Sequence, residues 1–207
     1  MTADAQSARD DLAFLKSLLG EDEYSGTRSF GEAYFAAGLI YGGQMILHAL
    51  QAAGFLPGSG VYALLIGIGP TILFIPVMAW IIWRNRSKRP AGVVGRSIGA
   101  VFGTIGIANL FLIVVIGSVA WREQSVSTWL IYPCCVFVLQ GTAWLFSFMM
   151  RKHGWHLAVA LGWFATAVAM AVCVAASPLF ILFAGIGLWF CMALPGWIVL
   201  RNAKGSA

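Results

Sequence analysis

The sequence predicts an all-α fold, a polytopic membrane helical bundle of six transmembrane helices with both termini in the cytoplasm and a short amphipathic helix in front. Its composition indicates a membrane protein, because 60% of the 207 residues are hydrophobic and only 10% are charged. Soluble domains usually contain about 25% charged residues. In addition, uncharged stretches of about 20 residues recur along the chain, each long enough to cross a hydrocarbon core about 30 Å thick.

Residues 1–28 form a polar segment that we expect in the cytoplasm and that contains the predicted amphipathic helix. Its apolar side chains recur at helical spacing opposite charged ones, up to Gly20. The apolar set is Leu12, Phe14, Leu15, Leu18 and Leu19, and the polar set is Asp10, Asp11, Lys16 and Ser17. The acidic face favours a protein partner over anionic lipid. Acidic residues also replace the basic region of a secretory signal, so we do not expect one.

The membrane domain is predicted over residues 29–201, followed by a cytoplasmic tail over residues 202–207. Its six spans are expected at about residues 30–55, 61–83, 94–121, 128–150, 155–176 and 178–200. Turn-forming residues join the first span to the second, at Pro57-Gly58, and the fifth to the sixth, at Ser177-Pro178. The chain is therefore expected to form three consecutive helical hairpins.

The positive charges predict the orientation of these hairpins, because loops near span ends keep lysine and arginine on the cytoplasmic side. With the N-terminus inside, all basic residues except Arg122 fall on that side. They are Arg9, Lys16, Arg28, Arg84, Arg86, Lys88, Arg89, Arg96, Arg151, Lys152, Arg201 and Lys204. An odd number of spans would break this asymmetry. Tryptophans gather near span ends, as expected for residues that prefer the membrane interface.

The first span carries the polar residues that are the best candidates for a ligand site. Tyr41, Gln44, His48 and Gln51 are spaced so that they share one helix face. Two amides in other spans, Asn109 and Gln140, are deep enough to meet that face. One interpretation is a ligand pocket or polar path with His48 as its titratable member. The other, which we favour, is that these groups join helices, because the set contains no buried carboxylate or lysine.

Two further sets of residues are expected to act on packing. Glu32 and Arg96 lie near the cytoplasmic starts of their spans, where they either pair with each other or reach the lipid head groups separately. Small residues spaced four apart permit close approach of helix backbones. These are Gly38 and Gly42 in the first span and Gly95, Gly99 and Gly103 in the third. We expect them to pack within one bundle, although a homo-oligomer is an alternative.

Several classes of function are disfavoured. The net charge of +5 comes without a nucleic-acid-binding motif and falls between apolar runs, so the lipid bilayer is the expected partner. No cofactor or metal is predicted, because only one histidine, His48, lies deep in a span. The four cysteines are expected to be packing residues, since none forms a CxxC pair. Hydrolase, metalloprotease and phosphate-loop motifs are absent from the sequence.

Two stretches, Asp10-Asp11-Leu12-Ala13-Phe14-Leu15 and Gly117-Ser118-Val119-Ala120-Trp121-Arg122-Glu123, together with the first span, resemble small bacterial inner-membrane proteins. The resemblance covers the whole chain and implies a multi-pass protein of the bacterial cytoplasmic (inner) membrane, but it implies no activity. Our leading hypothesis is a non-enzymatic sensory or accessory bundle whose N-terminal helix binds a protein partner. The alternative is a small transporter or channel that uses the polar face of the first span, and a membrane-embedded enzyme comes third.

Overall fold

The computed structural model describes residues 10, 25–57, 61–86, 93–175 and 177–204. Within these ranges the chain is helical and contains no strand. The elements are α2 (Ser25–Ala52), α3 (Val61–Asn85), α4 (Val93–Glu123), α5 (Val126–Arg151), α6 (Gly154–Val172), α7 (Ser177–Gly187), the π-helical η1 (Leu188–Ala193) and α8 (Leu194–Lys204). The all-helical prediction is therefore confirmed. The predicted amphipathic helix lies outside the described residues, apart from Asp10.

Six helical segments are long and apolar enough to cross a membrane, as predicted. Each predicted span falls on one of them, and the differences lie at the ends. The first span ends at Ala52 instead of residue 55, because the chain turns through Gly54, whose φ is +79°. Glycine adopts this left-handed conformation without the steric cost that a β-carbon imposes. The fifth span ends at Val172, where Cys173 begins a turn.

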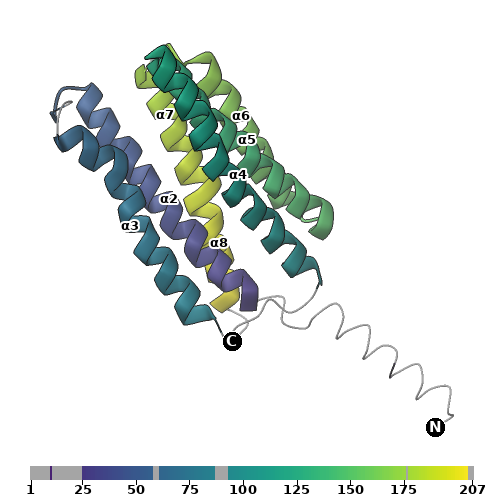
Figure 1. Ribbon diagram of the computed structural model, residues 1–207. Coiled ribbons are helices and arrows are strands. Elements are labelled where there is room, and N and C mark those ends of the chain that lie inside the picture. Colours follow the sequence, from purple (N-terminus) through teal and green to yellow (C-terminus); the bar gives the residue numbers. More distant parts are fainter. Residues whose placement is uncertain (1–9, 11–24, 58–60, 87–92, 176, 205–207) are drawn as a thin grey trace, which may run out of the picture.

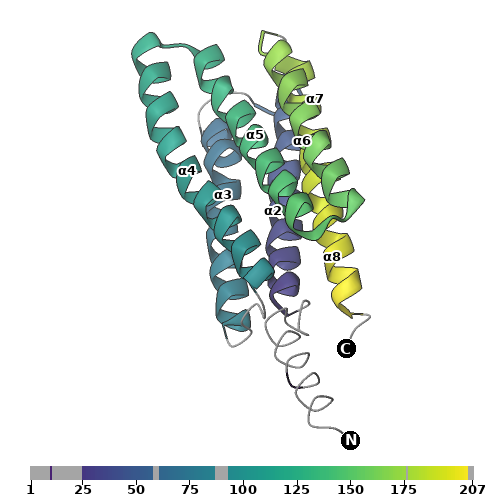
Figure 2. The same cartoon turned by 90° about the vertical axis from the view of Figure 1, so that its right-hand side faces the viewer.

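The helices pack in an open arc that runs from α3 through α2, the sixth span, α6 and α5 to α4 (Figures 1 and 2). Helix α2 packs against α3 on one side and against α7, η1 and α8 on the other, and α6 connects α7 to α5. Helix α4 packs chiefly against α5, and α3 packs chiefly against α2. The two helices at the ends of the arc therefore each depend mainly on one neighbour.

The N-terminus of α2 and the C-terminus of α8 lie at the same end of the bundle, where α3 also ends and α4 begins (Figure 1). We call this the basic end. It holds most of the charged side chains that the structure describes, namely Arg28, Glu32, Arg84, Arg86, Arg96, Arg151, Lys152 and Arg201. The α4–α5 turn at the opposite end contains Arg122 and Glu123.

The sixth span is one continuous helical path with a π-helical segment at its centre. Pro195 lacks the N–H group that would bond to the carbonyl of Cys191, and the preceding turn widens, with the N–H of Leu194 donating to the carbonyl of Trp189. Gly38 and Gly42 of α2 approach this segment closely. A β-carbon on Gly38 would overlap the backbone of Ala193, and one on Gly42 would lie 2.7 Å from Nε1 of Trp189. These two glycines therefore allow α2 to pack directly against η1.

The core lies between α2, α5, α6 and the sixth span, and large aromatic side chains fill it. Trp144 and Trp163 are 2% and 1% exposed, and Met170 is fully buried. The ring of Phe137 meets that of Trp163 edge to face, with centroids 4.7 Å apart. Aromatic rings favour this geometry because the positive edge of one ring meets the negative face of the other.

Candidate functional site

The predicted polar face of α2 lies against α3 and the turn that precedes it. The side-chain amide of Gln44 donates to the backbone carbonyl of Gly67 over 3.2 Å, and the hydroxyl of Tyr41 lies 3.5 Å from Oγ1 of Thr71. Gly67 directly follows Ile66, whose carbonyl loses its usual helical donor because residue 70 is a proline. The Gln44 bond therefore ties α2 to α3 beside an irregular part of the α3 ladder.

The outer part of the same face stabilises the α2–α3 turn. The side-chain amide of Gln51 donates to the carbonyl of Pro57 over 2.9 Å, and its oxygen lies 3.1 Å from Nδ1 of His48. His48 is only four residues from the end of α2, so it is nearer the end of the span than its centre. These bonds stabilise the end of the hairpin.

The two amides expected to meet this face lie elsewhere. Gln140 of α5 accepts a hydrogen bond from the hydroxyl of Tyr34 over 3.1 Å, and that hydroxyl accepts one from the indole N–H of Trp144 over 2.7 Å. Asn109 of α4 has a buried side-chain oxygen with no hydrogen-bond partner among the described residues. The structure therefore divides the six predicted residues among the α2–α3 contact, a buried α2–α5 network and an isolated position on α4.

The sequence analysis placed only His48 deep in a span, but His156 of α6 is buried in the structure. Its side chain is 2% exposed and lies under the ring of Trp155, with centroids 4.0 Å apart. Nδ1 of His156 is 3.5 Å from the hydroxyl oxygen of Ser147. Ser147 lies four residues before the end of α5 and His156 two residues after the start of α6, so both lie in the helical turns next to the α5–α6 connection. Their spacing alone does not predict that His156 points into the bundle.

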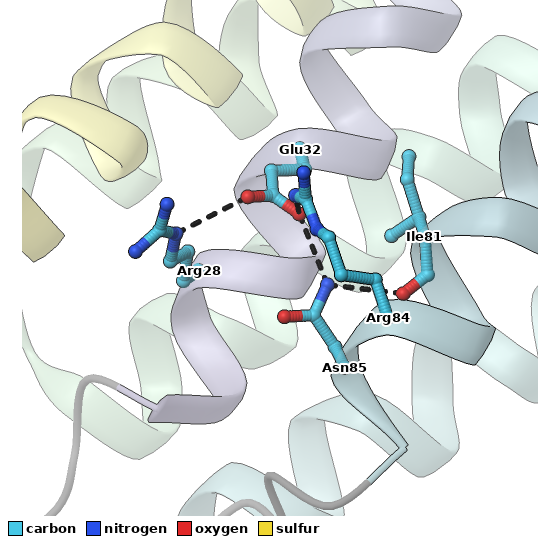
Figure 3. Close-up of polar contacts among 5 residues, drawn as sticks. All are labelled: Arg28, Glu32, Ile81, Arg84 and Asn85. Carbon is cyan, nitrogen blue, oxygen red and sulfur yellow. Dashed lines mark hydrogen bonds and ion pairs between the residues drawn. The ribbon is translucent and has the colours of Figure 1, made fainter.

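The most highly connected polar group in the described part of the chain is the carboxylate of Glu32, at the basic end (Figure 3). One oxygen pairs with Nε of Arg28 on the same helix over 3.2 Å, and the other pairs with the guanidinium of Arg84 from α3. The amide of Asn85 donates to the latter oxygen over 3.0 Å and also to the carbonyl of Ile81 over 3.0 Å. We call Arg28, Glu32, Arg84 and Asn85 the Glu32 cluster.

Glu32 of α2 therefore pairs with Arg84 of α3 and not with Arg96 of α4. Arg96 is exposed at the start of α4, whereas Arg84 belongs to α3, which packs along α2. The sequence analysis treated Arg84 as a loop residue because a run of basic residues follows it. In the structure, α3 continues two residues further, to Asn85, and this extension brings the arginine to Glu32.

Two of the three predicted packing glycines of α4, Gly99 and Gly103, do not face another described helix. A β-carbon on Gly99 or Gly103 would meet no atom within 4 Å, in contrast to Gly38 and Gly42. Gly95 lies at the start of α4 and is partly buried. Both Gly99 and Gly103 therefore lie on an outward-facing surface of α4.

The described residues contain no group of three or more histidine, cysteine or acidic side chains that could hold a metal ion. Their four cysteines are free thiols, of which Cys134 and Cys191 are buried. One surface hollow lies at the α4–α5 turn. It is lined by Gly117, Ala120, Trp121, Gln124, Ser125, Val126 and Trp129. None of these side chains is charged, so this hollow offers no acid, base or cationic group for catalysis.

Comparison with protein-family models, with curated proteins and with solved structures finds no match to this chain.

Proposed function

We propose that this chain is a multi-pass protein of the bacterial cytoplasmic membrane, with both termini in the cytoplasm, that acts as a non-enzymatic accessory or sensory protein. The main observation behind this proposal is that the polar face of α2 is occupied by contacts to α3 and to the turn before it. Tyr41, Gln44 and Gln51 each contact α3 or the turn before it. A face consumed in joining two helices is not available to line a path for a solute.

The remaining polar groups in the core support the same proposal. The hydroxyl of Tyr34 is satisfied by Gln140 and Trp144, and His156 lies beside Ser147 among aromatic rings. General acid–base catalysis needs titratable groups that converge on a space where a substrate fits. Here the bulky rings of Trp144 and Trp163 occupy the space between the helices.

The proposed orientation rests on the charges of the basic end. The described arginines at that end come from five helices, α2, α3, α4, α5 and α8, whereas Arg122 lies at the opposite end. Loops rich in lysine and arginine remain on the cytoplasmic side of bacterial membranes. The basic end is therefore assigned to the cytoplasm, and the polar segment before α2 is available there to a protein partner.

The experiment pairs partner capture with a transport assay. Full-length protein and a variant lacking residues 1–24, which leaves all of α2, would be cross-linked in native membranes and purified under identical conditions. We expect a specific protein with the full chain only, and no solute flux in proteoliposomes. Flux that His48→Ala abolishes and His153→Ala leaves intact would overturn the proposal in favour of a transporter. If the full-length protein and the truncated variant capture the partner equally, the N-terminal segment is not the binding element.

A further inference from the structure

The Glu32 cluster contains more positive charge than its carboxylate neutralises. Two guanidinium groups surround one carboxylate, so the cluster has a net charge of +1. Glu32 uses only Nε of Arg28 and one terminal nitrogen of Arg84, although each guanidinium has five N–H donors. Figure 3 shows the terminal nitrogens of Arg28 directed away from Glu32. The cluster therefore holds two cations in place while leaving much of their donor capacity available.

The exposure of these side chains shows that the cations face outward. The side chain of Glu32 is 13% exposed, whereas those of Arg28 and Arg84 are 43% and 38% exposed. The Arg84 guanidinium also stacks on the ring of Trp80, 4.1 Å from its centroid. The carboxylate beneath and the indole beside it limit the motion of Arg84, which lowers the entropy lost when it binds an anion.

The position of the cluster indicates where its ligand lies. Arg28 begins the first candidate membrane span, and Asn85 ends the second, so the cluster is at the level of the lipid head groups. One turn further into the span, the ring of Trp80, on which Arg84 stacks, is 51% exposed, as expected for a surface that contacts acyl chains. A ligand that meets both features has an anionic head and an apolar tail.

We propose that Arg28 and Arg84 form a binding site for the phosphate group of an anionic phospholipid in the leaflet at the basic end. Paired guanidinium groups match phosphate because their forked N–H donors form parallel, charge-assisted hydrogen bonds. Glu32 and Asn85 are positioning residues that hold Arg84 at the edge of α2. Anionic lipids are concentrated in the cytoplasmic leaflet, which agrees with the proposed orientation without depending on the proposed function.

The test measures binding of phosphatidylglycerol and phosphatidylcholine to the purified full-length protein in detergent, by native mass spectrometry. We expect wild-type protein to prefer phosphatidylglycerol by about tenfold or more, as for a charge-assisted bidentate contact. Arg28→Gln should remove most of that preference. This variant keeps the bonds of Glu32 to Arg84 and Asn85, so the α2–α3 contact and the fold should survive.

Arg201→Gln is the matched control, because it removes one arginine from the same end of the bundle, where Arg201 stacks on Trp197. It should change the preference by less than about twofold, as expected for an exposed charge outside the site. Equal losses in the two variants would show only diffuse attraction of anionic lipid and would overturn the proposal. Wild-type protein without a preference for phosphatidylglycerol would overturn it as well.

A third arm separates a lipid from a soluble phosphate compound. Inorganic phosphate at millimolar concentration should not displace phosphatidylglycerol, because it lacks the acyl chains that contact the apolar surface below the cluster. Displacement that depends on Arg28 would assign the site to a soluble anion instead and would overturn the lipid proposal. Arg84→Lys serves as a second variant, since it keeps the charge but loses the forked donors, and it should also weaken lipid binding.

Discussion

The α2–α3 and α5–α6 hairpins span the same membrane but are held together in different ways. In the α5–α6 hairpin, large rings and small residues interlock, and 33% and 28% of the two apolar stretches are buried. In α3 only 11% is buried, and polar contacts to α2 occur in the turn before it, in its first half at Gly67 and Thr71, and at its end. Since lipid tails are as apolar as leucine, apolar area alone does not drive helices together. Helix α3 is therefore held to α2 largely by polar bonds, whereas α5 and α6 are held together by close packing.

The largest effect is expected from Trp163→Ala in the tightly packed hairpin. The indole is 1% exposed and meets Phe137 edge to face, so its removal leaves a cavity that rigid neighbours cannot fill. The free energy of unfolding should fall by about 3–5 kcal/mol. Unfolding in mixed micelles with increasing sodium dodecyl sulfate would measure it. Val168→Ala on the same helix is the control, because Val168 is 63% exposed and should change little.

A pair of glycine substitutions compares the two hairpins directly. A β-carbon on Gly141 of α5 would lie 2.7 Å from the Phe164 ring of α6, whereas one on Gly67 of α3 would meet nothing within 4 Å. Gly141→Ala should therefore destabilise the protein by about 1–3 kcal/mol through overpacking. Gly67→Ala should be neutral or slightly stabilising, since alanine favours a helix. If the two substitutions change the free energy of unfolding by the same amount, the two hairpins do not differ in how closely they are packed.

The different bonding of the two hairpins also explains what the sequence could predict. Span length and composition depend only on local chemistry, so six helices of spanning length follow from the sequence. The shared face of Tyr41, Gln44, His48 and Gln51 follows from helical periodicity alone. Which helix that face meets is a property of the three-dimensional arrangement, and the apolar stretch of α3 gives no signal that its Gly67 carbonyl accepts from Gln44.

Glu32 illustrates the same limit for charged groups. In the sequence, Arg84 and Arg96 are equally plausible partners for Glu32, because both lie near cytoplasmic span ends. Only the packing of α3 along α2 selects Arg84 as the ion-pair partner. Likewise, identical small-residue spacing occurs in α2 and α4, but a β-carbon on Gly38 would overlap Ala193 of η1 whereas one on Gly103 would meet nothing within 4 Å. Spacing predicts a surface that permits close approach, but it does not predict whether another helix occupies that surface.

Glu32→Ala should produce the third largest effect, and it should be confined to the α2–α3 hairpin. It removes the acceptor shared by Arg28, Arg84 and Asn85, at a cost of about 1–2 kcal/mol for a partly exposed ionic group. Hydrogen exchange should accelerate near the end of α3 and remain unchanged in α6. Glu123→Ala removes an exposed carboxylate that accepts from Thr128, and it should leave the exchange of α3 unaltered. Acceleration throughout the protein would mean that α3 is not an independently held helix.

The smallest effect is expected from Gln44→Leu, which replaces the amide that donates to Gly67 with an apolar side chain of similar size. Interhelical hydrogen bonds in membranes average about 0.6 kcal/mol, so global stability should change only slightly. Hydrogen exchange around Gly67 should nevertheless rise, since its carbonyl loses the side-chain donor. Combined with Glu32→Ala, the substitution tests cooperation between the contacts along α3. Effects that add would show independent ties, whereas a combined loss larger than their sum would show that α3 detaches from α2 as a unit.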